Sequence, residues 1–156
     1  MPYLSQELAA DLRAALAAEA VAAQRYSYFS QIAEIEGATE AARLFADLAA
    51  SVACAAHGHL DVLRDATVPD AESDIGDTAL NLASSIVDAL RDADETYPDL
   101  LSAAHDEGQA DVASWLTTLA ALKKAHVGKL NQVLEVLAGP SDPASATRTS
   151  LGGSHD

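Results

Sequence analysis

Hydrophobic residues recur every three to four positions along most of the chain, which is the spacing of one face of an α-helix. Apolar and polar residues do not alternate as in strands, and alanine and leucine are abundant. Glycine or proline interrupts the pattern where helices should end. The pattern predicts an all-α fold with four long helices: about Leu4 to Glu36, after Thr39 to about Ala66, from near Asp74 or Asp77 to just before Gly108, and about Ala110 to Ala138.

Local signals refine these boundaries. Thr39 is a favourable N-cap for the second helix. Pro98 lies inside the third helix and should kink it or open one turn, because proline lacks a backbone N–H. After Gly139-Pro140 the sequence is rich in Ser, Thr, Pro and Gly and has no apolar period. We therefore expect a helical domain over residues 1–139 and a disordered tail over residues 140–156.

The two halves of the chain align without a gap at an offset of 71 residues. Tyr26 matches Tyr97, and Glu36-Gly37 matches Glu107-Gly108. Val62-Leu63 matches Val133-Leu134 at the same offset. Each half then forms a helical hairpin with a tight glycine turn, and residues 67–76 must connect the hairpins. This repeat predicts an antiparallel four-helix bundle made of two copies of one hairpin.

Composition narrows the range of partners. The net charge of −15 disfavours nucleic acid and anionic membranes. The sequence does not open with basic residues followed by an apolar stretch, as a secretory signal would. No uncharged stretch reaches the 18 or so residues typical of a membrane span. Cys54 is the single cysteine, so an internal disulfide and a cysteine-ligated metal site are excluded within this sequence. We expect a cytoplasmic protein, and a dimer formed through small residues on the second helix (Ala49, Ala53 and Cys54).

Several motifs resemble the rubrerythrin branch of the ferritin-like proteins. Glu19, the stretch Arg25-Tyr26-Ser27-Tyr28-Phe29 and Glu36-Gly37 are similar to the first helix of that family. Tyr97-Pro98 with Glu107-Gly108 is similar to its third helix. The resemblance covers about residues 5–137. It does not include the rubredoxin-like Cys₄ domain that many members carry, because a single cysteine cannot form it.

The resemblance implies two irons held by one Glu from each of two helices and a Glu-x-x-His from each of the other two. Rubrerythrins use this site to reduce peroxide, and they typically carry a further Glu on the third helix. Glu19 and His126 stand at expected ligand positions, and Asp92 is an acid where the third helix should carry one. The other ligand positions hold different residues: Val52, Ala55, Ala89 and Lys123. No Glu-x-x-His or Asp-x-x-His occurs anywhere in the sequence.

The preferred interpretation is a polar core without a cofactor, in which the Lys123 ammonium takes the place of the metal charge. The former metal centre would then comprise Glu19, Val52, Ala55, Asp92, Lys123 and His126. One alternative is a remodelled site for iron or another divalent metal, held by Glu19, His59, Asp92 and His126. Another is that Lys123 extends into solvent.

Three functions follow from these interpretations. The first is a metal-free structural, binding or interaction module. The second is an oxidoreductase that acts on peroxide or dioxygen at a remodelled metal site. The third is a metal-free enzyme that uses Lys123 as acid, base or nucleophile. Residues Thr149 to Gly153 faintly resemble the targeting peptides of encapsulin cargo, although a plain flexible tail explains them more simply.

Overall fold

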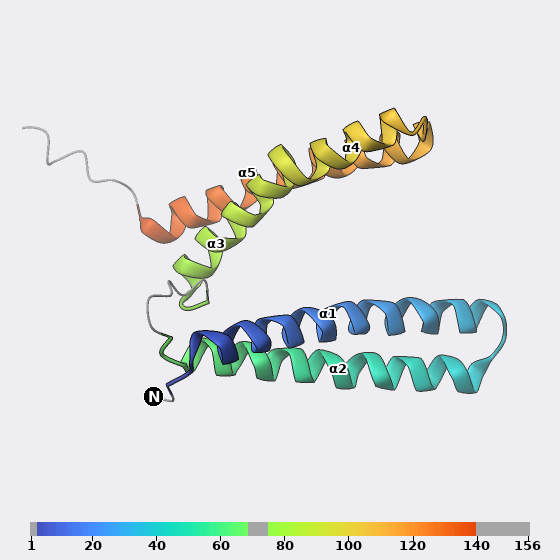
Figure 1. The fold of residues 1–156 in the computed structure, drawn as a ribbon, viewed down its shortest axis with the longest axis horizontal. Coiled ribbons are helices and arrows are strands. Elements are labelled where there is room, and N and C mark those ends of the chain that lie inside the picture. Colours follow the sequence, from blue (N-terminus) through green and yellow to red (C-terminus); the bar gives the residue numbers. More distant parts are fainter. Residues whose placement is uncertain (1–2, 69–74, 140–156) are drawn as a thin grey trace, which may run out of the picture. The chain divides into compact units, whose positions relative to one another are not determined.

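The computed structural model describes residues 3–68 and 75–139. The chain forms two compact units, Met1–Gly76 and Asp77–Asp156, and each is a helical hairpin (Figure 1). Over the described ranges the elements are all helical, apart from an isolated bridge between Tyr3 and Thr67. The all-α prediction is confirmed. The predicted tail lies outside the described residues, as does the centre of the predicted connection.

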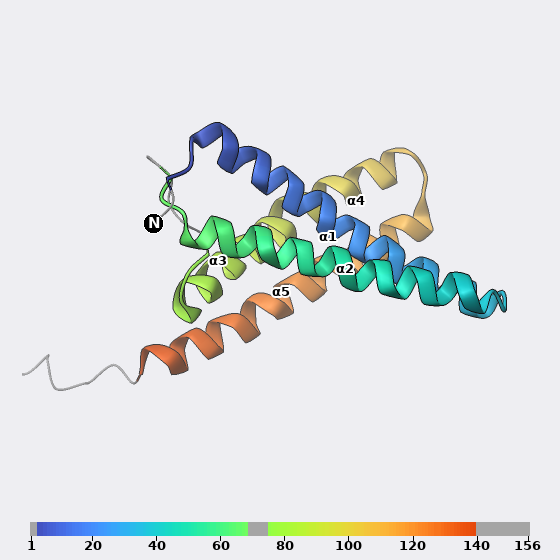
Figure 2. The same ribbon diagram turned by 90° about the horizontal axis from the view of Figure 1, so that it is seen from below.

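The first hairpin pairs α1 (Gln6–Ile35) with α2 (Thr39–Asp65), which run side by side in opposite directions (Figures 1 and 2). Ser5 caps α1 by accepting a hydrogen bond from the Leu8 N–H at 3.1 Å. The prediction of Thr39 as N-cap is wrong, because Ala38 holds that position and makes no side-chain cap bond. The tight backbone turn at Gly37 sets the start of α2 instead.

The second hairpin pairs α5 (Ala110–Ala138) with a helical arm made of three segments, α3 (Thr78–Arg91), η1 (Asp92–Thr96) and α4 (Tyr97–Asp106). Asp77 caps α3 by accepting from the Leu80 N–H at 2.9 Å. η1 is a single wide π-helical turn closed by the bond from the Tyr97 N–H to the Asp92 carbonyl. Pro98 follows directly. Its missing N–H and its ring explain the widened turn, so the predicted opening of the helix is confirmed.

The two hairpin turns have equivalent backbone hydrogen bonds. Gly37 and Gly108 adopt φ values of 74° and 70°, the left-handed conformation that glycine adopts without strain. The N–H of the following residue bonds back across the turn at 2.8 Å in both cases, from Ala38 to Ala33 and from Gln109 to Ala104. These pairs are separated by the same offset of 71 residues, so the duplication extends to the backbone geometry.

Small residues allow the helices of each hairpin to approach closely. Most of the buried apolar residues in the described ranges are alanines, among them Ala33 and Ala42 in the first hairpin and Ala104 and Ala113 in the second. Around them, Phe45 stacks with Tyr26 at 6.2 Å between ring centroids. Tyr97 and Leu101 pack at the equivalent place in the second hairpin.

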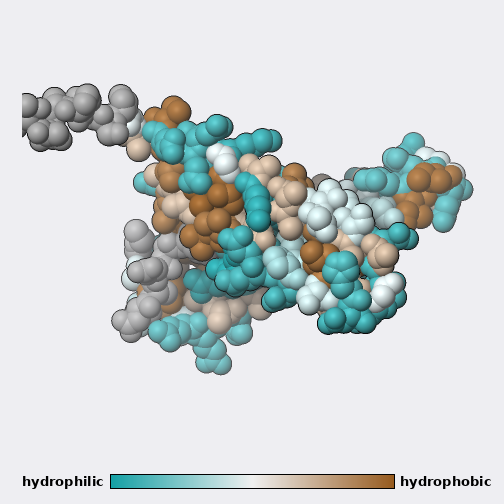
Figure 3. Space-filling view, turned by 90° about the horizontal axis from the view of Figure 1, so that it is seen from above, coloured by the Kyte–Doolittle hydropathy of each residue, from teal (hydrophilic) through white to brown (hydrophobic). Residues whose placement is uncertain are grey.

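Each hairpin leaves large apolar side chains exposed. Hydrophobic residues reach the surface in several places on the face drawn in Figure 3. Trp115 is 60% exposed and Tyr28 is 62% exposed. On α2, Ala49 and Ala53 are half-buried while Cys54 is exposed, so the small-residue strip predicted for a dimer contact is only partly accessible.

Candidate functional site

An ion pair between Asp92 and Lys123 marks the candidate site. The Lys123 Nζ lies 2.8 Å from the Asp92 Oδ2, and the two side chains are 28% and 33% exposed. The hydrogen bond to Asp92 raises the pKa of Lys123 above its ordinary value, burial acts in the opposite direction, and the charge of Asp92 reinforces the increase. Lys123 is therefore a charged ammonium at neutral pH, fixed on a carboxylate.

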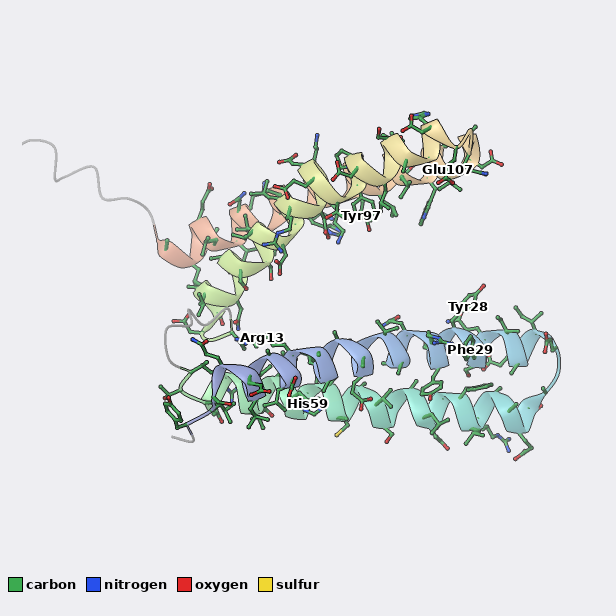
Figure 4. All side chains as sticks on the ribbon, in the orientation of Figure 1. Arg13, Tyr28, Phe29, His59, Tyr97 and Glu107 are labelled. Carbon is green, nitrogen blue, oxygen red and sulfur yellow. The ribbon has the colours of Figure 1, made fainter. Side chains whose placement is uncertain are left out.

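The local backbone explains how these two side chains meet. Asp92 is the first residue of η1, where the helix widens ahead of Pro98. Lys123 projects from the middle of α5, and its Nζ also lies 6.0 Å from the centroid of the Tyr97 ring. Figure 4 labels this tyrosine on the second hairpin, together with Glu107 at the glycine turn. The π-turn thus brings an acid and an aromatic ring to the same lysine.

A cavity of about 450 Å³ adjoins the ion pair within the second hairpin. Its walls come from α3, η1 and α5, and they combine charged, polar and apolar side chains: Ser85, Asp88, Ala89, Asp92, Lys123, His126, Lys129 and Leu130. His126 is half-buried. Three residues predicted for the former metal centre, Asp92, Lys123 and His126, therefore line one cavity.

The other predicted residues belong to the first hairpin. Glu19 and His59 are half-buried there, and Val52 is half-buried while Ala55 is exposed. Figure 4 labels His59 on α2. The two hairpins are described separately, so the joint cluster of all six residues stays a prediction. No group of three His, Cys, Asp or Glu side chains suited to a metal ion occurs within residues 3–68 and 75–139.

Cys54, His57 and Asp61 are spaced three and four residues apart on α2, so they lie on one face of that helix and could form a row of thiol, imidazole and carboxylate. All three are exposed. The Asp61 Oδ1 lies 3.5 Å from the Arg64 Nη2, so the carboxylate already has a cationic partner. Within the described part of the chain, no other ion pair or hydrogen bond involves these three side chains.

Comparison with known proteins identifies the family. The sequence model of the Rubrerythrin family matches residues 11–134. This chain belongs to the rubrerythrin family. It is also 27% identical over 135 residues to Rubrerythrin-1 of Clostridium acetobutylicum, an alignment that covers 81% of this chain and 69% of that protein. The resemblance inferred from the tyrosine and Glu-Gly motifs is confirmed, and with it the class of all-α ferritin-like bundles built from two repeated hairpins.

The helices of this rubrerythrin-family chain are too short or too polar to cross a membrane, over the part of the chain that the structure describes.

Sequence reasoning missed four residues that line the cavity, namely Ser85, Asp88, Lys129 and Leu130. A signal for Lys129 was present. All three lysines of this rubrerythrin-family chain fall between residues 123 and 129, and no acidic residue occurs between Asp111 and Glu135. In a chain with 24 acidic and 9 basic residues, this concentration of positive charge marks α5 as unusual.

Proposed function

We propose that this rubrerythrin-family protein is a metal-free structural or binding module whose former metal centre is stabilised by an ion pair. The observation that carries the proposal is the 2.8 Å contact between Lys123 and Asp92. In this account, the ammonium supplies the positive charge that a metal ion would otherwise supply to the surrounding carboxylates.

The side chains at the expected ligand positions do not suit two irons. Val52 and Ala55 offer no donor atom. Lys123 has a raised pKa and stays protonated, and a protonated amine has no lone pair to give to a metal. A cation next to this ammonium would also be repelled by it. Asp92 is already engaged in the ion pair, which leaves Glu19 and His126 as the remaining expected ligands.

The proposal includes Glu19 as a second carboxylate of the same centre. Glu19 is half-buried on α1 although it is a charged residue. The family resemblance assigns Glu19 to a ligand position of this centre, where the Lys123 ammonium would offset its charge together with that of Asp92. A double-mutant cycle between Glu19→Gln and Lys123→Met tests this step. Additive effects on stability would place Glu19 outside the centre.

The raised pKa of Lys123 weighs against the use of its amine as a nucleophile. A lysine nucleophile must be neutral when it reacts, which requires a lowered pKa. Here the hydrogen bond to Asp92 raises the pKa instead. We therefore assign Lys123 a structural and electrostatic role.

Restoring the missing ligands tests the proposed function. The triple variant Val52→Glu, Ala55→His and Lys123→Glu should gain about two equivalents of iron, because it rebuilds a Glu-x-x-His at positions 52 and 55 and a second one at positions 123 and 126. The matched control carries Lys124→Glu in place of Lys123→Glu, which makes the same charge change one residue away. Metal content after dialysis is the readout. Equal iron uptake by the control triple variant would contradict the role given to Lys123.

A further inference from the structure

One lysine in the wall of the cavity is left over when each carboxylate of that wall is matched with its ion-pair partner. Asp92 pairs with Lys123 at 2.8 Å, and Asp88 pairs with Arg91 at 3.3 Å. Both carboxylates in the cavity wall are therefore neutralised. Lys129 and His126, which also line it, form no ion pair with any residue in the described ranges.

The positions of these two residues favour a shared ligand. His126 and Lys129 are three residues apart on α5, so they are neighbours on its surface. Ser85 cannot donate to an anion in its present rotamer, because its hydroxyl donates to the Asn81 carbonyl at 2.7 Å. An anion in the cavity would accordingly bind to the ammonium of Lys129 and the imidazole N–H of His126.

The remaining wall of the cavity is apolar. Ala89 is buried, and Leu130 is half-buried beside it. A volume of about 450 Å³ exceeds that of an inorganic anion and falls in the range of small-molecule sites. A ligand that fills the cavity needs an apolar body in addition to its charged group.

We infer that this cavity binds a small organic acid, with its carboxylate on Lys129 and His126 and its short apolar body against Ala89 and Leu130. The inference rests on the proposed function, because Lys129 and His126 remain the uncompensated groups only if Lys123 neutralises Asp92 in place of a metal. The inference names small organic acids as the ligand class of the proposed binding module.

Butyrate is a suitable probe, because it combines a carboxylate with a three-carbon apolar chain. Titration of the full-length protein with butyrate, followed by amide NMR shifts, should show saturable changes on α3 and α5. Butyramide has the same shape without the charge and should cause no saturable change. Lys129→Gln should weaken butyrate binding about fivefold, which corresponds to about 1 kcal/mol for an exposed ion pair.

Lys124→Gln is the matched control, since it removes the same charge from the same helix at a residue that does not line the cavity. It should leave the butyrate affinity within about twofold of the wild type. If both variants weakened butyrate binding equally, the effect would come from the general charge of α5, and the inference would be overturned. Binding of butyramide as tight as that of butyrate would also overturn it.

Elemental analysis of the same sample separates this failure from a failure of the proposed function. Metal-free protein that does not bind butyrate overturns the ligand class alone. Stoichiometric metal in the sample overturns the proposed function, and the inference with it.

Discussion

Lys123 is a cation held between a carboxylate and an aromatic ring, at a position where its family is expected to place a metal-binding carboxylate. Replacing it with alanine leaves Asp92 without its partner in a half-buried position. The pair is neither fully exposed nor fully buried, so the cost should fall between those of surface and buried pairs. We expect Lys123→Ala to reduce the free energy of unfolding by about 1–2 kcal/mol, measured by urea denaturation.

Lys124→Ala provides the comparison for this prediction. Lys124 is exposed and forms no ion pair among the described residues. Its replacement should change stability by less than about 0.5 kcal/mol. A loss at Lys123 no larger than the loss at Lys124 would contradict the account of the ion pair.

The ion pair should also depend on pH in a defined direction. Asp92 raises the pKa of Lys123 in the folded state, so the folded protein holds this proton more tightly than the unfolded chain. The contribution is fully present below the ordinary lysine pKa of 10.5 and is lost as pH rises through the raised folded value. The stability difference between wild type and Lys123→Met should stay constant from neutral pH to about pH 9.5 and then decrease. A difference that already disappears near neutral pH would contradict this assignment.

At the scale of the helical elements, the two glycine turns make matched predictions. Gly37 and Gly108 have positive φ values, and an added Cβ would meet no atom within 4 Å at either position. Alanine there suffers backbone strain without a clash, so Gly37→Ala and Gly108→Ala should each destabilise by about 1 kcal/mol. Gly58 lies inside α2 with equally open space, and Gly58→Ala should instead stabilise by up to about 1 kcal/mol. Thermal unfolding of the three variants checks the contrast. An unchanged melting temperature for either turn variant would be evidence against backbone strain from alanine at that turn.

The helices could be predicted closely because their limits are set by local chemistry. Ala110 and Ala138 bound α5 as the apolar period and the Gly-Pro stop predict. Pro98 predicted the opened turn, because proline has no backbone N–H and therefore removes a hydrogen bond from its own helix. The predicted N-cap of α2 was wrong, because the turn at Gly37 brings Ala38, and not Thr39, to the capping position. A threonine side chain gives no information about where the preceding backbone turn closes.

The candidate site was predictable only where one helical hairpin holds it. The i, i+3 spacing predicts that Lys123 and His126 lie near each other, and the family resemblance predicts Asp92 in the same centre. All three residues line the cavity. The participation of Asp88, Ser85 and Lys129 depends on how α3 packs against α5. That packing follows from tertiary contacts around Ala89, which no local pattern specifies.

On the scale of the whole molecule, an exposed apolar face of α1 provides a second candidate contact surface for a dimer, besides the small residues of α2. Val21, Tyr28 and Ile35 are spaced seven residues apart, and they are 59%, 62% and 87% exposed. Tyr28 projects away from α2 (Figure 4). Such a strip on a protein with a net charge of −15 favours contact with another protein surface. Sedimentation at micromolar concentration should give a dimer, and Tyr28→Lys with Ile35→Lys should shift it toward monomer. A wild type that sediments as monomer alone would rule the dimer out.

The metal content of the wild-type protein tests the central claim most directly. Protein purified without chelator from cells supplemented with iron, manganese and zinc should contain less than about 0.1 equivalent of each by elemental analysis, because in the proposed function the Lys123 ammonium takes the place of the metal charge. About one equivalent of tightly held metal, lost on Glu19→Ala or His126→Ala, would contradict the claim. That result would favour the alternative of a remodelled metal site acting on peroxide or dioxygen.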